Sequence, residues 1–291
     1  MQPIVTEKTN RKYDPVSEDR KGKPEGRRAE VSGIVIPNPN TGERMSAALF
    51  TPRDEGKRPT ILLLHGFPGD ENNFDLAHVF QRAGYVVLVI HYRGTWGSEG
   101  LFSLSGVLED VGVTLKFIRE HSAKNDAFGF DAERLFLIGH SMGGFAALET
   151  AAKDHDLLGA AGIAAFDFSL AAKMPNLNEA MREQFRENLS IWRIGLDELM
   201  RQIDDCAEEW SFPSLAPGLS RLPVCLIGAS QDEISLPKYH WQPLCEALTE
   251  IGGEHFTSCL LEAEHSLSDR RIELASILLR WANSLLESLT A

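Results

Sequence analysis

Apolar and polar positions follow two alternating rhythms along most of the chain. Short continuous apolar runs are typical of strands buried on both faces, and apolar residues recurring every three or four positions are typical of amphipathic helices. The expected strands after residue 59 are Thr60–Leu64, Tyr85–Ile90, Arg134–Ile138, Leu157–Phe166, Pro223–Gly228 and Phe256–Leu261. The expected helices are Asn73–Gly84, Val107–His121, Ser141–Lys153, Tyr239–Ile251 and Ser268–Leu286. This alternation predicts an α/β fold with a doubly wound, mostly parallel sheet.

Two runs that precede this alternation have a different character. Glu30–Ile36 and Met45–Phe50 are separated by a stretch of turn-forming residues, Pro37–Gly42. Such a pair predicts an antiparallel hairpin at the start of the sheet. Residues 1–28 before it mix charges of both signs and show almost no apolar periodicity, so we expect a polar N-terminal arm.

The alternation is interrupted once, between the fourth and fifth expected parallel strands. Residues 168–221 are rich in helix-forming and acidic residues, which predicts a helical cap insertion within a core of residues 29–167 and 222–291. The spacing of Phe185, Leu189, Trp192 and Leu196 predicts one apolar helix face in this insertion. We expect this face mainly to pack on the core and partly to line a substrate pocket.

Composition and charge exclude several classes of protein. Hydrophobic residues make up 43% of the 291 and charged residues 24%, as in ordinary globular domains rather than disordered or fibrous chains. The net charge of −13 argues against a nucleic-acid binder, which would carry a basic surface. There is no apolar window of roughly 18 residues and no apolar segment typical of a signal peptide, so we expect a cytoplasmic protein without a membrane partner.

The four cysteines do not form a recognisable metal or disulfide pattern. No two of them make a C-x-x-C pair, and their neighbouring histidines are too few for a zinc site. We therefore expect reduced, structural thiols and neither a metal nor an organic cofactor.

The segment Gly139-His140-Ser141-Met142-Gly143 carries the most informative chemistry. A G-x-S-x-G pattern alone is weak evidence, but here an apolar strand leads into it and a helix leads out. A serine on so sharp a strand-to-helix turn is pushed clear of the sheet, and glycines on either side give the turn room. The alternative interpretation is a helix N-cap serine beside packing glycines.

In this context the sequence resembles the α/β-hydrolase superfamily from about Glu30 to the C-terminus. His65-Gly66-Phe67-Pro68-Gly69 follows the first parallel strand, as the oxyanion-hole loop of that superfamily does. The stretch from Tyr92 to Gly100 is similar to one in dienelactone-hydrolase-like and peptidase-like members. The resemblance implies that the backbone N–H groups of Phe67 and Met142 form the oxyanion hole. Pro68 could not serve, because it has no N–H.

A serine nucleophile needs a histidine base, and nine histidines compete for that role. His265 is the best candidate because it lies just beyond the last expected strand, at the edge where parallel strands end. His140 should point elsewhere, because neighbouring residues on a turn diverge. The other histidines lie in or beside helices, in the oxyanion loop, or at unsuitable strand ends.

The histidine must in turn be oriented by an acid lying between Ser141 and His265 in the chain. Asp232 directly follows a buried strand and is the favoured candidate. Asp167, at the end of the preceding strand, is the main alternative, and Glu233 is a third. Together these residues predict the catalytic triad Ser141, Asp232 and His265.

The predicted function is hydrolysis of a small-molecule carboxylic ester through an acyl-enzyme on Ser141. A small peptidase or amidase and a carbon–carbon bond hydrolase are the alternatives among enzymes. The alternative outside enzymes is a catalytically silent binding module with the same fold. Trp96 and Trp192 are expected to line the substrate pocket.

Overall fold

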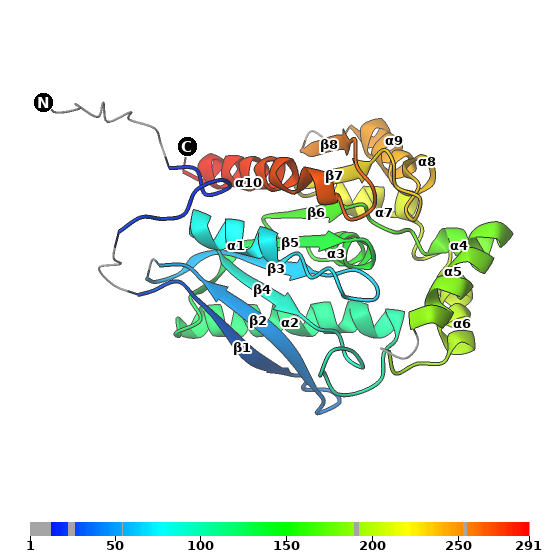
Figure 1. The fold of residues 1–291 in the computed structure, drawn as a ribbon, viewed down its shortest axis with the longest axis horizontal. Helices are drawn as coiled ribbons and strands as arrows, with labels where there is room; N and C mark the ends of the chain where they lie inside the picture. The colour runs from blue at the N-terminus through cyan, green and yellow to red at the C-terminus, as the bar shows by residue number, and fades with distance from the viewer. Residues whose placement is uncertain (1–12, 23–26, 54, 189–191, 253–254, 291) are drawn as a thin grey trace, which may run out of the picture.

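The computed structural model describes residues 13–22, 27–53, 55–188, 192–252 and 255–290. Within these residues one eight-stranded sheet has the order β1-β2-β4-β3-β5-β6-β7-β8 (Figure 1). The strands are β1 (Glu30–Pro37), β2 (Arg44–Thr51), β3 (Arg58–Leu64), β4 (Val86–Ile90), β5 (Phe130–His140), β6 (Gly159–Ile163), β7 (Val224–Ala229) and β8 (Phe256–Leu261). β1 pairs antiparallel with β2, and β2 with β4, whereas β3 to β8 run parallel. The predicted α/β fold, with its mostly parallel sheet and N-terminal hairpin, is confirmed.

Helices cover both faces of the sheet, which explains the continuous apolar runs. The helices are α1 (Phe74–Ala83), α2 (Leu104–Lys124), α3 (Met142–Ala151), α4 (Ser169–Lys173), α5 (Pro175–Asn188), α6 (Leu196–Cys206), α7 (Phe212–Leu219), α8 (Pro237–His240), α9 (Gln242–Ile251) and α10 (Arg271–Ser288), with a 3₁₀ turn η1 (Ser268–Arg270). In β3, Ile61 and Leu63 pack in the core beneath α1 and α10. Leu62 and Leu64 pack on the opposite side with α2 and α3. Neither face of this strand can therefore be polar.

Several boundaries differ from the expected ones for local reasons. β5 begins at Phe130, before the apolar run, because Phe130 and Asp131 pair with the start of β3 ahead of a register shift. β6 ends at Ile163, and the next residue, Ala164, has a left-handed φ of 42°. The helix expected over Tyr239–Ile251 is divided at Trp241 into α8 and α9.

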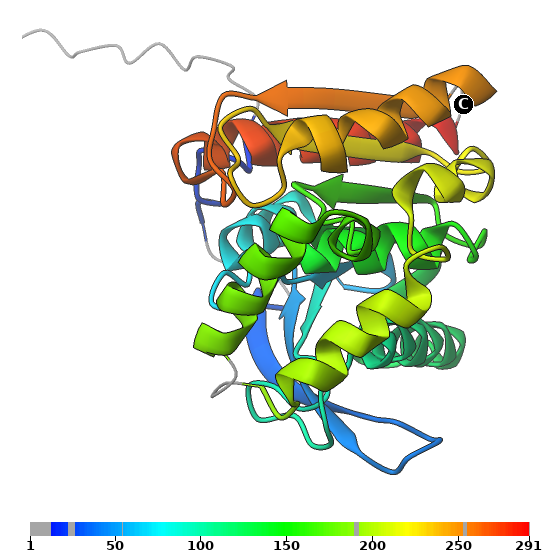
Figure 2. The ribbon, with the colours of Figure 1, turned by 90° about the vertical axis from the view of Figure 1, so that its right-hand side faces the viewer.

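The chain between β6 and β7 forms α4 to α7. Figure 2 shows α5 and α6 in front of the sheet, at the end toward which the parallel strands point. α7 instead packs against α3 and α9, in the helical layer beside the sheet. α5 ends at Asn188 and α6 begins at Leu196, so Phe185 and Leu196 lie on different helices and the predicted single apolar face does not form. Leu189 lies outside the described residues.

The described part of the N-terminal arm, residues 13–22, is tied to the core. Arg82 Nε donates to the Pro15 carbonyl at 2.8 Å, and Arg53 donates to the Gly22 carbonyl at 2.6 Å. Val16 packs against the core beneath α1 and α10. None of the helices among the described residues has the length and apolar character needed to cross a membrane.

Candidate active site

Ser141 occupies a strained turn between β5 and α3. Its φ of 56° and ψ of −118° are rare for a residue with a side chain. The turn is also too crowded for side chains at its glycines. A Cβ on Gly139 would lie 1.9 Å from the Gly143 carbonyl oxygen, and one on Gly143 would lie 2.3 Å from the Leu64 oxygen. The G-x-S-x-G pattern is therefore a steric requirement of this turn.

Three residues from three strand ends meet at this turn. His265, beyond β8, places Nε2 2.9 Å from Ser141 Oγ. The other ring nitrogen of His265, Nδ1, lies 2.8 Å from Oδ2 of Asp232, which follows β7. A hydroxyl, an imidazole and a carboxylate in this sequence of contacts can pass a proton from serine to histidine and stabilise the resulting cation.

Asp232 is buried but well supplied with hydrogen-bond donors. Its Oδ1 accepts from the N–H groups of Ile234 at 2.8 Å and Ser235 at 2.7 Å, which leaves Oδ2 for His265. Burial raises the pKa of Asp232, but the contact with His265 and the two N–H donors outweigh it, so the net pKa lies below the ordinary value. Asp232 is therefore favoured as an anion.

The other histidines near the site stay uncharged. Burial lowers the pKa of His140 to about 3 and those of His65 and His240 to about 4. His140 is engaged by a group other than Ser141, since its Nε2 lies 2.9 Å from the His265 carbonyl oxygen. Neutral His140 can thus hold the loop that carries His265, a contact that sequence adjacency to Ser141 does not reveal.

Neither alternative acid contacts His265. Asp167 is buried, and its Oδ1 and Oδ2 accept from the backbone N–H groups of Ser169 and Phe212 at 2.9 and 3.0 Å. Both carboxylate oxygens of Asp167 therefore accept hydrogen bonds from the helical insertion, one from near its start and one from near its end. Glu233 is exposed to solvent.

The expected oxyanion loop passes directly beside Ser141. A Cβ on Gly66 would lie 2.9 Å from Ser141 Cβ, so this loop and the turn are in contact. Met142 is the first residue of α3, and the first N–H groups of a helix have no partner within it. The N–H groups of Phe67 and Met142 thus belong to segments that border the serine on two sides.

A narrow cavity of about 20 Å³ opens beside Ser141 beneath α5. Apart from Ser141 itself, its lining is apolar except for Gln184. The described lining residues are Phe67, Ser141, Met142, Phe166, Phe168, Met181, Gln184, Phe185 and Ile234. Ser141, Phe67 and Met142 were named from the sequence for catalysis, and Phe185 for the apolar spacing within the insertion; the remaining lining residues were not foreseen. No group of three His, Cys, Asp or Glu side chains that could hold a metal occurs among the described residues.

The two tryptophans expected to line the pocket are not among the described residues around this cavity. Trp96 is 42% exposed, and its indole nitrogen donates to the Pro68 carbonyl at 2.9 Å. Trp192 is 3% exposed and donates to the same carbonyl at 3.0 Å. Their contribution to a pocket with substrate bound stays a prediction.

Comparison with known proteins agrees with this geometry. A model of the alpha/beta hydrolase family matches residues 61–271, which is more than half of the chain. The chain belongs to the alpha/beta hydrolase family. The resemblance noted in the sequence is thereby confirmed, and family membership supports hydrolysis as the general function.

Two sequence relatives cover parts of the chain. Protein bem46 of Schizosaccharomyces pombe is 26% identical over 182 residues, which are 62% of this chain and 53% of that protein. Acylamino-acid-releasing enzyme 1 of Oryza sativa is 34% identical over 135 residues, which are 40% of this chain and 16% of that enzyme. The chain therefore corresponds to about half of the first relative and a small part of the second.

Solved structures share the fold at low sequence identity. A puromycin-hydrolyzing peptidase of Mycobacterium tuberculosis has a TM-score of 0.68 and 18% identity, covering 89% of this chain and 39% of that one. An esterase of Pyrococcus furiosus has a TM-score of 0.60 and 16% identity, covering 87% of this chain and 94% of that one. Peptidases and esterases both appear among these neighbours, so the fold leaves the bond that is cleaved open.

Proposed function

We propose that this protein is a serine hydrolase that cleaves carboxylic esters through an acyl-enzyme on Ser141. The observation that carries the proposal is the continuous series of contacts from Ser141 Oγ to His265 and from His265 to Asp232. A serine hydroxyl is a weak nucleophile, and this arrangement supplies both the base and the anion that orients it.

The reaction follows from which group holds the proton at each stage. His265 Nε2 accepts the Ser141 proton as Oγ bonds to the ester carbonyl carbon, and Asp232 stabilises the imidazolium. The tetrahedral intermediate collapses when His265 gives the proton to the departing alcohol. A water molecule then attacks the acyl-enzyme, with His265 again accepting a proton, and Ser141 is regenerated as the acid leaves.

The oxyanion formed in each half-reaction requires donors in place beforehand. We assign this role to the backbone N–H groups of Phe67 and Met142, since their segments border Ser141 on two sides. The N-terminus of α3 adds the positive end of its helix dipole. Loss of one such donor costs about 10²–10³ in turnover in other serine hydrolases.

The lining of the cavity favours an uncharged acyl group. Aromatic and aliphatic side chains bury apolar surface, and Gln184 is the one described lining side chain besides Ser141 that can hydrogen-bond to a substrate. A charged group would lose its hydration here without gaining a partner. These properties suit apolar esters.

A second candidate function is cleavage after an acylated amino acid. It is favoured by the 34% identity to the rice acylamino-acid-releasing enzyme over 135 residues. An acylated amino acid is uncharged at its nitrogen, so it too is compatible with the apolar lining. It differs from the first candidate in the bond that is broken.

The test compares parent and Ser141→Ala proteins. We expect fluorophosphonate labelling of the parent and hydrolysis of p-nitrophenyl esters of two to eight acyl carbons, both lost in Ser141→Ala with an unchanged melting temperature. N-acetylated amino-acid p-nitroanilides serve as the amide series. Faster turnover of these anilides than of matched esters would favour the second candidate. Equal ester hydrolysis by a folded Ser141→Ala protein would overturn the proposal.

A further inference from the structure

Two indole side chains converge on a single carbonyl oxygen in the oxyanion loop. The Pro68 oxygen accepts from Trp96 Nε1 at 2.9 Å and from Trp192 Nε1 at 3.0 Å. A carbonyl oxygen has two lone pairs, so both bonds can form at once. Trp96 comes from the loop after β4 and Trp192 from the insertion, 124 residues from Pro68.

The packing of Trp192 brings it against the residue that bears a proposed oxyanion donor. Its ring lies 4.2 Å from that of Phe67 and 3.6 Å from that of Phe102, measured between centroids. Phe67 also meets Phe185 of the cavity lining at 4.8 Å. The side chain of Phe67 thus packs against two aromatic rings, and such pairs stabilise the position of Phe67 beyond the burial of apolar surface.

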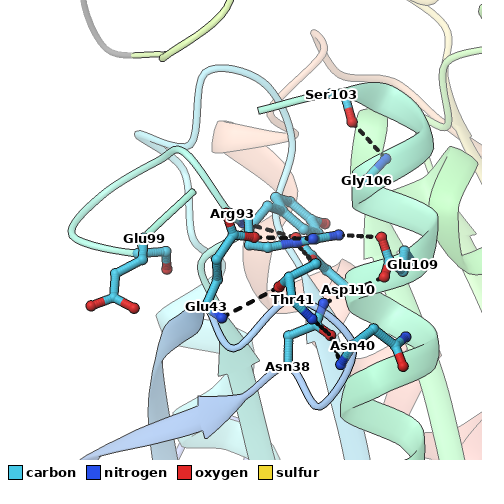
Figure 3. A network of polar contacts seen from close by, with 12 residues as sticks. Asn38, Asn40, Thr41, Glu43, Arg93, Glu99, Ser103, Gly106, Glu109 and Asp110 are labelled. Carbon is cyan, nitrogen blue, oxygen red and sulfur yellow. Dashed lines mark hydrogen bonds and ion pairs between the residues drawn. The ribbon is translucent and has the colours of Figure 1, made fainter. Parts of the chain in front are cut away.

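The loop that carries Trp96 is itself anchored by charge. Arg93 is buried and donates through its backbone N–H and its side chain to Asp110 of α2, at 2.8 and 2.5 Å. Its guanidinium also contacts Glu109 at 2.5 Å and Glu43 at 3.2 Å. Figure 3 shows this guanidinium extended toward α2 beside the turn of the β1–β2 hairpin. A buried arginine with three carboxylate partners fixes the start of the loop firmly.

The same loop is joined to the insertion by backbone hydrogen bonds. The Phe102 N–H donates to the Arg193 carbonyl at 3.2 Å, and the Arg193 N–H donates to the Gly94 carbonyl at 3.3 Å. The loop that contains Trp96 and the part of the insertion that contains Trp192 are therefore hydrogen-bonded to each other. This arrangement accounts for both indoles meeting at Pro68 despite their distance in sequence.

We propose that Trp96 and Trp192 are positioning residues that hold the His65–Gly69 loop where the Phe67 N–H can stabilise the oxyanion. The proposal rests on the serine-hydrolase function proposed above. Neither indole touches the reacting atoms. Each acts through the Pro68 carbonyl, so each affects the transition state, in which the oxyanion has formed, more than the ground state.

The test removes the indole N–H groups and keeps aromatic rings. The variants are Trp96→Phe, Trp192→Phe and the double variant. Trp241→Phe is the matched control, since its indole nitrogen also donates to a backbone carbonyl, that of Leu226, at 3.2 Å. The measurements are kcat and KM on a p-nitrophenyl ester, and Ki for a trifluoromethyl ketone and for the alcohol of the same skeleton.

The ketone reports on the oxyanion hole directly. Ser141 Oγ adds to its carbonyl carbon, His265 takes the serine proton, and the former carbonyl oxygen becomes an oxyanion held by the hole. The alcohol cannot form this adduct and reports ground-state binding alone. A merely structural role for the tryptophans would change the two Ki values together.

We expect kcat to fall about 3- to 10-fold in each single variant and about 10- to 100-fold in the double variant, with KM nearly unchanged. Ki for the ketone should rise by the same factor as kcat/KM falls, while Ki for the alcohol and all values for Trp241→Phe stay near those of the parent. If the double variant does not fold, the single variants provide the same comparison of ketone with alcohol.

Parent-like kcat in the variants, or equal changes for ketone and alcohol, would overturn the positioning role. A parent protein that neither hydrolyses esters nor binds the ketone would instead overturn the function on which this role depends.

Discussion

Asp167 and Asp232 occupy equivalent places in the fold but have different surroundings. Each follows a buried parallel strand, β6 or β7, and the two are 1% and 3% exposed. Asp167 gives both oxygens to backbone N–H groups, whereas Asp232 gives one oxygen to the backbone and the other to His265. Position at a strand end therefore does not make an aspartate suitable as the acid of a triad. It must also keep one oxygen unoccupied by the backbone.

The difference also appears in the pKa values. Burial raises the pKa of Asp167, and its backbone partners do not fully offset this. Asp232 faces the same burial, but with His265 beside it the pKa falls below the ordinary value. A neighbour that can carry a positive charge thus determines which of the two carboxylates is favoured as an anion.

The largest expected effect comes from Asp232→Asn. The amide cannot accept from His265 as a carboxylate does, so kcat on p-nitrophenyl esters should fall about 10³- to 10⁴-fold. Glu233→Gln, next to it on the exposed side of the same turn, is the control and should retain parent activity. Comparable kcat values for Asp232→Asn and the parent would show that the acid lies elsewhere.

Asp167→Asn should reverse the pattern by affecting stability rather than turnover. The side-chain amide of asparagine would place its NH₂ group against one of the two backbone N–H groups that now donate to Asp167. That N–H would lose its acceptor, which should lower the free energy of unfolding by up to about 3 kcal/mol. Denaturant unfolding should show this loss, while kcat stays within about tenfold of the parent. Asp232→Asn measured in parallel completes the comparison. A loss of turnover as large as that variant's would contradict the separation of roles.

Glu149 extends the comparison to a buried carboxylate without backbone donors. It is 1% exposed, and the Lys153 ammonium, 3.4 Å from Oε2, also contacts Glu209 at 2.9 Å. Burial raises the pKa of Glu149 to about 7 from 4.5. The folded state therefore binds the proton of the Glu149 carboxyl more tightly than the unfolded state does. The stabilisation of the folded state that this protonation provides is lost as the pH rises from about 4.5 to about 7.

The free energy of unfolding of Glu149→Gln, relative to that of the parent, should therefore rise by about 2–3 kcal/mol from pH 5 to pH 8. The exposed Glu209→Gln serves as the control, for which we expect no comparable gain. Melting temperatures of the three proteins at both pH values provide the measurement. A difference between parent and Glu149→Gln that is the same at pH 5 and pH 8 would show that Glu149 is already ionised at pH 5.

Much of the fold could be predicted because it is encoded locally. The continuous apolar run Thr60–Leu64 indicates a strand covered on both faces, and Ile61 and Leu62 indeed pack into opposite cores. The single helix face expected in the insertion was wrong, because apolar spacing persists from Phe185 to Leu196 although α5 ends at Asn188. Apolar periodicity indicates which residues are buried, but it does not indicate where a helix ends.

The candidate site, too, could be predicted from the sequence only in part. Ser141, Asp232 and His265 could be proposed because each lies at a strand end, and the order of such ends follows the chain. Their catalytic roles stay predictions until the variants are measured. The convergence of Trp96 and Trp192 on Pro68 could not be foreseen, since bonds spanning 28 and 124 residues leave no local pattern.

The hydrogen bonds of Asp167 have a consequence for the origin and redesign of selectivity. Because the first and last parts of the insertion meet at one carboxylate, we expect that the intervening segment could be replaced by another without reconnecting the core. A grafted segment would bring its own cavity wall. If the grafted segment had no tryptophan in the place of Trp192, the Pro68 carbonyl would accept a hydrogen bond from Trp96 but not from an indole of the insertion. A new substrate specificity would then be accompanied by a lower kcat.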